Sequence, residues 1–200
     1  ALLAIAADRN GKIQVLHKEG LLHTKNGQFL FPGSLVTDRT YRFMSDKKIN
    51  DIISVEEQFV YLTDQAVVSN AWAGELYIEH SIPQACIIAG YAKEGESQIV
   101  PERLHFLVSD GSQLEYLAPQ GSTWKGRIDN DSIHAIRVLN NQVFFILSSQ
   151  GISTFNPESK ELRLLTKGES FTHFDFINEG KNLVVGTKNG YLILDSSTEA

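Results

Sequence analysis

Residues 177–195 read INEGKNLVVGTKNGYLILD, and the pattern of this stretch recurs at the other end of the chain. An apolar run at 183–185 is followed by a short polar segment, by Asn189-Gly190 and by a second apolar run. The same order is found at 2–13, around Asn10-Gly11. Runs of β-branched and aliphatic residues are typical of strands, and glycine supplies the positive φ of a tight hairpin turn. We therefore predict antiparallel hairpins at both ends of the chain.

The middle of the chain contains the same unit several times. Ile49 and Ile133 begin two stretches that align without a gap over the next 20 residues, so that 59–62 falls on 143–146. Residues 104–109 match 143–148 in the same way. Repeats of about 40 residues, each with three or four short strands, are the signature of β-propeller blades. The sequence predicts an all-β, propeller-type repeat protein with four to five blades.

We expect a single domain over residues 1–200. Its approximate blades are 1–31, 48–81, 85–129, 132–167 and 171–195. In the first blade, 2–8 is predicted as the second strand from the inside, and the last blade stops after its third strand. Both terminal blades would then lack an element, so we expect an incomplete propeller, a part of a larger one, or an edge that a partner covers.

Composition and charge exclude several classes of protein. The 200 residues are 42% hydrophobic and 21% charged, with a net charge of −6, which is ordinary globular composition. The acidic balance disfavours a nucleic-acid surface, and no apolar run is long enough to span a membrane. The single cysteine, Cys86, rules out an intrachain disulfide, and its apolar surroundings predict a small buried side chain.

The last unit resembles a known repeat. Its matching positions are Leu183, Val184, Val185, Gly186, Thr187, Gly190, Tyr191 and Asp195. They fit the segment "LWIGT-x-x-GL-x-x-Y" of the propeller repeat in the sensor regions of bacterial two-component regulators, although the usual Trp is absent. The other units keep mainly the hydrophobic skeleton. This resemblance implies a non-enzymatic, periplasmic or extracellular sensor that binds a carbohydrate-like ligand, with a homodimer as one arrangement.

The innermost strand of each blade lines the central channel of a propeller. Asn50, His134 and His173 fall at nearly equivalent places on three such predicted strands. A ring of polar side chains there could hold an anion, a metal ion or a sugar hydroxyl, and imidazole is a good ligand for several metals. The alternative is a hydrated channel without a ligand. Arg137 lies three positions after His134, and strict alternation would place it on the opposite face.

Aromatic side chains near the blade edges offer a second kind of site. Trp124 follows a Gly-Ser turn and is the leading candidate for stacking against a sugar or for a protein contact, and Tyr77 belongs to the same group. Packing between neighbouring blades is the alternative explanation for Trp124.

Three functions remain open at this stage. A ligand-binding sensor comes first, a protein–protein interaction scaffold second, and a propeller glycan lyase or hydrolase third. The sequence contains no recognisable catalytic motif, so no catalytic residue is predicted, and neither a metal nor a cofactor is expected.

Overall fold

The computed structural model describes residues 1–18, 20–25, 28–30, 48–56, 58–71, 74–94, 103–128, 132–139, 142–168 and 170–197. Over these residues the chain forms five antiparallel sheets, in which consecutive strands are neighbours. The first sheet contains β1 (Leu2–Ala7), β2 (Ile13–His17), β3 (Gly20–Lys25) and β4 (Gln28–Leu30). The second contains β5 (Ile49–Val55), β6 (Gln58–Thr63), β7 (Ala66–Ala71) and β8 (Gly74–Glu79).

The remaining three sheets follow the same plan. The third contains β9 (Ile87–Ala92), β10 (Leu104–Ser109), β11 (Gln113–Ala118) and β12 (Gly121–Arg127). The fourth contains β13 (Ile133–Val138), β14 (Phe144–Ser148), β15 (Gly151–Asn156) and β16 (Glu161–Lys167). The fifth contains β17 (His173–Ile177), β18 (Asn182–Thr187) and β19 (Gly190–Asp195), with a short 3-10 turn, η3 (Asn178–Gly180), between its first two strands.

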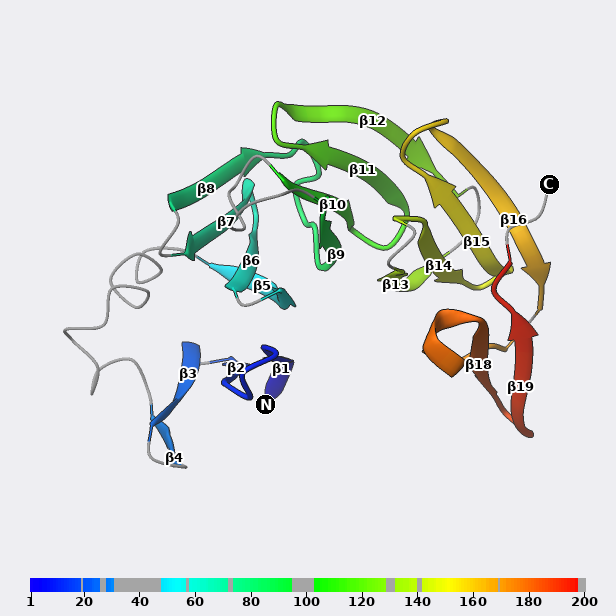
Figure 1. Cartoon of the computed structure of the whole chain (residues 1–200), viewed down its shortest axis with the longest axis horizontal. Coiled ribbons are helices and arrows are strands. Elements are labelled where there is room, and N and C mark those ends of the chain that lie inside the picture. Colours follow the sequence, from blue (N-terminus) through cyan, green and yellow to red (C-terminus); the bar gives the residue numbers. More distant parts are fainter. Residues whose placement is uncertain are drawn as a thin grey trace.

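The five sheets stand side by side in an arc, in chain order (Figure 1). The first strand of each sheet contacts the first strand of the next, from β1 through β5, β9 and β13 to β17. Each sheet therefore runs outward from a shared centre, which is the arrangement of propeller blades. The predicted all-β propeller fold is confirmed.

The first sheet differs from its prediction in one respect. β1 is the edge strand that contacts β5, so residues 2–7 form the innermost strand and not the second. With β2, β3 and β4 the sheet has four strands, whereas the fifth sheet has three among the described residues. The error arose because β1 resembles β18 in sequence, although the two strands occupy different places in their blades.

Glycine is needed where the second hairpin of the fourth sheet turns. Gly151 has a φ of 140°, and a Cβ atom there would lie 2.1 Å from the carbonyl oxygen of Thr166. Any side chain at this position would collide with the backbone of β16. The equivalent Gly190 of the fifth sheet has a φ of 137°.

The hydrophobic core is divided among the seams between neighbouring sheets. The seam between the second and third sheets is largely aliphatic and includes Leu62, Ile78 and Val108. The seam between the third and fourth sheets is rich in aromatic residues, among them Phe144 and Phe155. Two further clusters fill the first and last seams. Each sheet is thus stabilised by the sheets beside it, as in other repeat proteins.

Candidate functional site

A hollow of about 580 Å³ lies at the centre of the arc, between the innermost strands of the first four sheets. Most of its wall is aliphatic. Its polar and reactive side chains are Asp51 on β5, Ser54 on the same strand, Cys86 just before β9, and His134 and Arg137 on β13. A concave, mainly apolar site with a few polar groups is the usual form of a small-molecule site.

Asp51 is the most perturbed group in this hollow. Its Oδ1 accepts a hydrogen bond from the backbone N–H of Ile52 at 2.9 Å, and its Oδ2 accepts one from the N–H of Ile88 at 3.2 Å. Burial raises the pKa of Asp51 from 3.8 to about 6, against the opposing effects of these two N–H groups and of the Arg137 charge. The carboxyl group therefore bridges two blades and titrates close to neutral pH.

His134 and Arg137 both border the hollow, as do Ala135 and Ile136 between them, so this stretch of β13 lies along its wall. A β-bulge between Ile133 and Ala135 interrupts the ladder of β13. Because a bulge adds one residue to one strand, alternation cannot be counted across it. Both side chains are solvent-exposed, which leaves an imidazole and a guanidinium accessible at the mouth of the hollow.

Cys86 is exposed in this hollow, so the prediction of a buried side chain is wrong. Partial burial, together with the charges of Asp110 and Asp51, raises the pKa of its thiol. The thiol is therefore a neutral, weakly polar part of the wall at neutral pH and not an activated nucleophile.

Asn50 is not among the residues that line the hollow, although Asp51 next to it is, and its amide group is already engaged. Its Nδ2 donates to Asp64 Oδ1 at 2.7 Å and to the carbonyl oxygen of Ala85 at 2.9 Å. The second bond joins β5 to the segment that leads into the next blade. This geometry gives Asn50 a role in holding two blades together.

His173 lies at the start of β17, in the fifth sheet, and is not among the residues that line the hollow. It is exposed, and its Nδ1 is 2.9 Å from Thr172 Oγ1. A Cβ atom on Gly186 would lie 2.5 Å from the His173 ring, so the imidazole rests directly on that glycine of β18. His134 and His173 are therefore not brought together in the hollow.

Trp124 packs between blades. Its ring stacks on Phe155 of the fourth sheet with the ring centres 4.2 Å apart, and the side chain is partly buried. Tyr116 is buried in the same cluster, where its hydroxyl is 2.7 Å from His105 Nδ1. Among these aromatic candidates Tyr77 is the one that remains largely exposed, at 55%.

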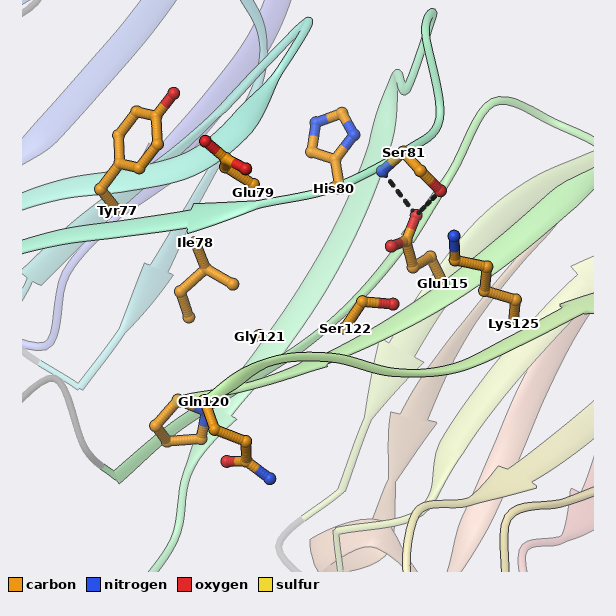
Figure 2. A pocket seen from close by; sticks show the side chains of 11 residues that line it. Tyr77, Ile78, Glu79, His80, Ser81, Glu115, Gln120, Gly121, Ser122 and Lys125 are labelled. Carbon is orange, nitrogen blue, oxygen red and sulfur yellow. Dashed lines mark hydrogen bonds between the residues drawn. The ribbon is translucent and has the colours of Figure 1, made fainter.

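Tyr77 borders a second, outer groove of about 600 Å³ between β8 and β12 (Figure 2). Ser81 and Glu115 face each other at one end, beside Lys125, while Tyr77 stands at the other end. Glu115 is 1% exposed, and its Oε2 accepts the backbone N–H and the hydroxyl of Ser81, both at 2.8 Å. Burial alone would raise the pKa of Glu115, but the bonds from Ser81 and Ser122 and the charge of Lys125 outweigh it and lower the pKa.

In the described part of the chain, no group of three or more His, Cys, Asp or Glu side chains is arranged to hold a metal ion. No described helix combines the length and hydropathy needed to cross a membrane.

No protein-family model matches the chain, and no curated protein matches it. Several solved structures do match the chain. One is the extracellular domain of the putative one component system BT4673 from B. thetaiotaomicron, with a TM-score of 0.63, 15% identity, and coverage of 100% of this chain and 30% of that one. Another is XC5397 from Xanthomonas campestris, a gluconolactonase, with a TM-score of 0.59, 12% identity, and coverage of 96% and 70%. A third is YCF48 bound to D1 peptide, with a TM-score of 0.60, 11% identity, and coverage of 98% and 64%.

These likenesses show the fold. This chain is a five-bladed propeller-type structure, and the predicted resemblance to propeller sensor regions is confirmed at the level of architecture. A second BT4673 structure, the extracellular domain of the putative hybrid two component system, matches with a TM-score of 0.64. The chain spans less than a third of either BT4673 chain.

Sequence reasoning missed Asp51 and did not include Arg137 among the residues of the hollow. The signal for Asp51 was present, because an aspartate among Ile49, Ile52 and Ile53 is out of place in a packed strand. The signal for Arg137 was absent, because nothing in the sequence of β13 marks its bulge.

Proposed function

We propose that this chain is the ligand-binding part of a non-enzymatic sensing propeller, and that a carbohydrate-like molecule occupies the central hollow. The observation that carries the proposal is the set formed by Asp51, His134 and Arg137 on an otherwise aliphatic wall. Sugar hydroxyls both donate and accept hydrogen bonds, so they suit a site that combines an acceptor carboxyl, a donor guanidinium and an imidazole.

The size and position of the hollow support the same proposal. A volume of about 580 Å³ falls within the usual range for small-molecule sites. Four blades contribute to its wall, so a ligand there would contact several sheets at once. Binding could then alter how the blades sit against one another, which is what a sensor requires.

A location outside the cytoplasm belongs to this proposal. It is supported by the fold shared with the extracellular domains of BT4673. A carbohydrate-like ligand is supported less directly, by the chemistry of the wall. A homodimer that changes on binding is a further part of the proposal.

The test is a melting experiment with a panel of neutral and acidic mono- and oligosaccharides. A ligand at 100 times its Kd stabilises the folded state by about 2.7 kcal/mol, which is readily measured. The shift should vanish in Arg137→Ala and in His134→Ala. Arg163→Ala is the matched control, because Arg163 is an exposed arginine on β16 that pairs with Glu161 at 2.6 Å, outside the hollow.

Two results would contradict the proposal. One is a melting temperature that no saccharide changes at millimolar concentration. The other is a shift of equal size in the wild type, in Arg137→Ala and in Arg163→Ala, which would place binding elsewhere.

A protein-interaction scaffold is the second candidate function. It is favoured by the outer groove, which the exposed ring of Tyr77 lines together with polar side chains from two blades. Aromatic residues with a polar end are enriched where proteins bind one another. Loss of a partner in Tyr77→Ala, with saccharide binding absent throughout, would favour this function over the sensor.

A further inference from the structure

The arginine that borders the central hollow has no carboxylate partner within the described part of the chain. Arg163 on β16, by contrast, is paired with the carboxylate of Glu161. The hydrogen bond that Arg137 makes runs from its Nη1 to the carbonyl oxygen of Ile136, at 3.2 Å. A guanidinium has five N–H donors, so most of those on Arg137 remain available to a ligand.

The charge of this guanidinium acts on the interior of the hollow. Arg137 is exposed, and its positive charge lowers the pKa of Asp51 on β5, against the larger effect of burial. Much of the surrounding wall is aliphatic and includes Ile5, Ile53 and Ile87. Because apolar side chains screen charges less than water does, an ion beside Arg137 would be held more strongly here than on an open surface.

The negative group of the hollow is already engaged by the protein. The two oxygens of Asp51 accept the N–H groups of Ile52 and Ile88, and the carboxyl loses its charge as the pH falls through about 6. The pKa of the Cys86 thiol is raised, so this side chain is neutral. The positive charge of Arg137 is thus the one that a ligand can still neutralise, and an anionic group matches the hollow better than a cationic one.

We propose that the ligand of the central hollow is an acidic sugar whose carboxylate is bound by the guanidinium of Arg137, an assignment that rests on the function proposed above and narrows it from carbohydrate-like ligands to uronic acids. A guanidinium donates two parallel N–H bonds to one carboxylate, and such charge-assisted pairs are stronger than bonds between neutral groups. The carbon-bound hydrogens of the sugar ring pack on the aliphatic wall, which removes apolar area from water.

The test measures dissociation constants by isothermal titration calorimetry. The probes are galacturonate and glucuronate, as monosaccharides and in short oligosaccharides, each beside its methyl ester, which keeps the shape of the sugar and removes its charge. We expect the acid to bind about 10- to 100-fold more tightly than its ester, as is usual for a hydrogen bond to a charged group. In Arg137→Gln, which keeps hydrogen-bond donors and loses the charge, acid and ester should bind equally.

Arg163→Gln is the matched control, because it removes an exposed arginine outside the hollow, and it should keep the full preference for the acid. A preference that survives in Arg137→Gln overturns the proposal. Galactose 6-sulfate tests whether the anion is a carboxylate, and tighter binding of this sulfate than of the uronic acids also overturns it.

The failure of this proposal is distinguishable from that of the sensing function. Equal affinity of the wild type for acid and ester, with binding still lost in Arg137→Ala, overturns the acidic ligand and leaves a carbohydrate sensor. The absence of binding by every saccharide, charged or neutral, overturns both.

The pH dependence gives an independent readout. The ionisable groups around Arg137 are Asp51 of β5, Cys86 before β9 and His134 of β13, with Asp110 acting on Cys86, while β1 contributes only apolar residues to the wall. As the pH falls from about 7.5 to about 5, Asp51 loses negative charge and an imidazole such as that of His134 gains positive charge, whereas a uronic acid stays ionised. The preference for the acid over its ester should therefore increase several-fold. A preference that decreases over this range would overturn the proposal.

Discussion

Two neighbouring seams of this propeller are built from different chemistry. The seam between the second and third sheets contains an aliphatic cluster and three hydrogen-bonded contacts of polar side chains. The carboxyl group of Asp51 accepts the N–H of Ile88, the amide of Asn50 donates to the carbonyl of Ala85, and Glu115 accepts the N–H of Ser81. The seam between the third and fourth sheets is formed by stacked and tilted rings, including Tyr91, Phe144 and Phe155.

The difference suggests a division of roles. Aromatic packing supplies much area and is insensitive to pH. Polar bonds contribute less each, but they demand one relative position of the two sheets, and those to carboxyl groups depend on protonation. We therefore expect the aromatic seam to dominate stability and the polar seam to dominate its pH dependence.

Phe155→Ala should have the largest effect. Phe155 is 0% exposed and contacts Trp124, Tyr116 and Phe144. Truncation of a buried phenylalanine costs about 3–5 kcal/mol through lost burial and the cavity left behind. Urea unfolding measures the loss, with Tyr77→Ala as an exposed control. A loss below about 1 kcal/mol, the centre of ordinary point mutations, would contradict the role given to this seam.

Asp51→Asn should change the pH dependence of stability. Because its pKa is raised in the folded state, the carboxyl group contributes stability that is fully present below about pH 3.8 and is lost as the pH rises through about 6. A shift of about two units corresponds to roughly 3 kcal/mol. The free energy of unfolding of the wild type should thus fall relative to that of the variant between pH 4 and pH 7.

Asp175→Asn is the matched control for this measurement. Asp175 also accepts the N–H of the next residue, Phe176, at 2.8 Å, but it is exposed and bridges no blades. Parallel pH profiles for the wild type and Asp51→Asn would show that the bridge to Ile88 does not depend on protonation.

Glu115→Gln should have a smaller effect of opposite pH sign. The amide oxygen can still accept one bond from Ser81, but the charge is lost, so we expect a cost of about 1–2 kcal/mol at neutral pH. Since the folded pKa of Glu115 is lowered, its contribution is present above the ordinary value of 4.5 and is lost as the pH falls below it. Acid titration of stability measures this, and Glu158→Gln, at an exposed position, should show no such loss.

The fold was predictable because its signals repeat. Apolar runs and glycine turns at a constant spacing identify the blades without any knowledge of contacts, and the turn glycine Gly151 has the positive φ that its sequence position predicts. The innermost position of β1 was not predictable in this way. That position depends on which strand contacts β5, and pairing between sheets leaves no local pattern.

The site was predictable only in part. His134 borders the hollow as the repeat register indicates, and Arg137 borders it too, on a strand whose bulge has no sequence signal. The sequence left two explanations for Trp124, a contact with a sugar or a protein and packing between blades. Its stacking partner Phe155 lies on another blade, so only the folded structure shows that packing. The local pattern thus predicts which strand a residue belongs to, while its function depends on the neighbouring sheet.

Tyr116→Phe should have the smallest effect on the free energy of unfolding. It separates the contribution of hydrogen bonding from that of ring packing in the seam between the third and fourth sheets. The hydroxyl groups of Tyr91 and Tyr116 and the ring of His105 are linked at 3.3 Å and 2.7 Å, but all three residues belong to the third sheet. Removal of the hydroxyl keeps the ring against Phe155 and loses a bond that does not cross the seam, so we expect a cost of about 0.5–1.5 kcal/mol. If urea unfolding shows a loss as large as that of Phe155→Ala, hydrogen bonding and not ring packing stabilises this seam, and the contrast between the two seams fails.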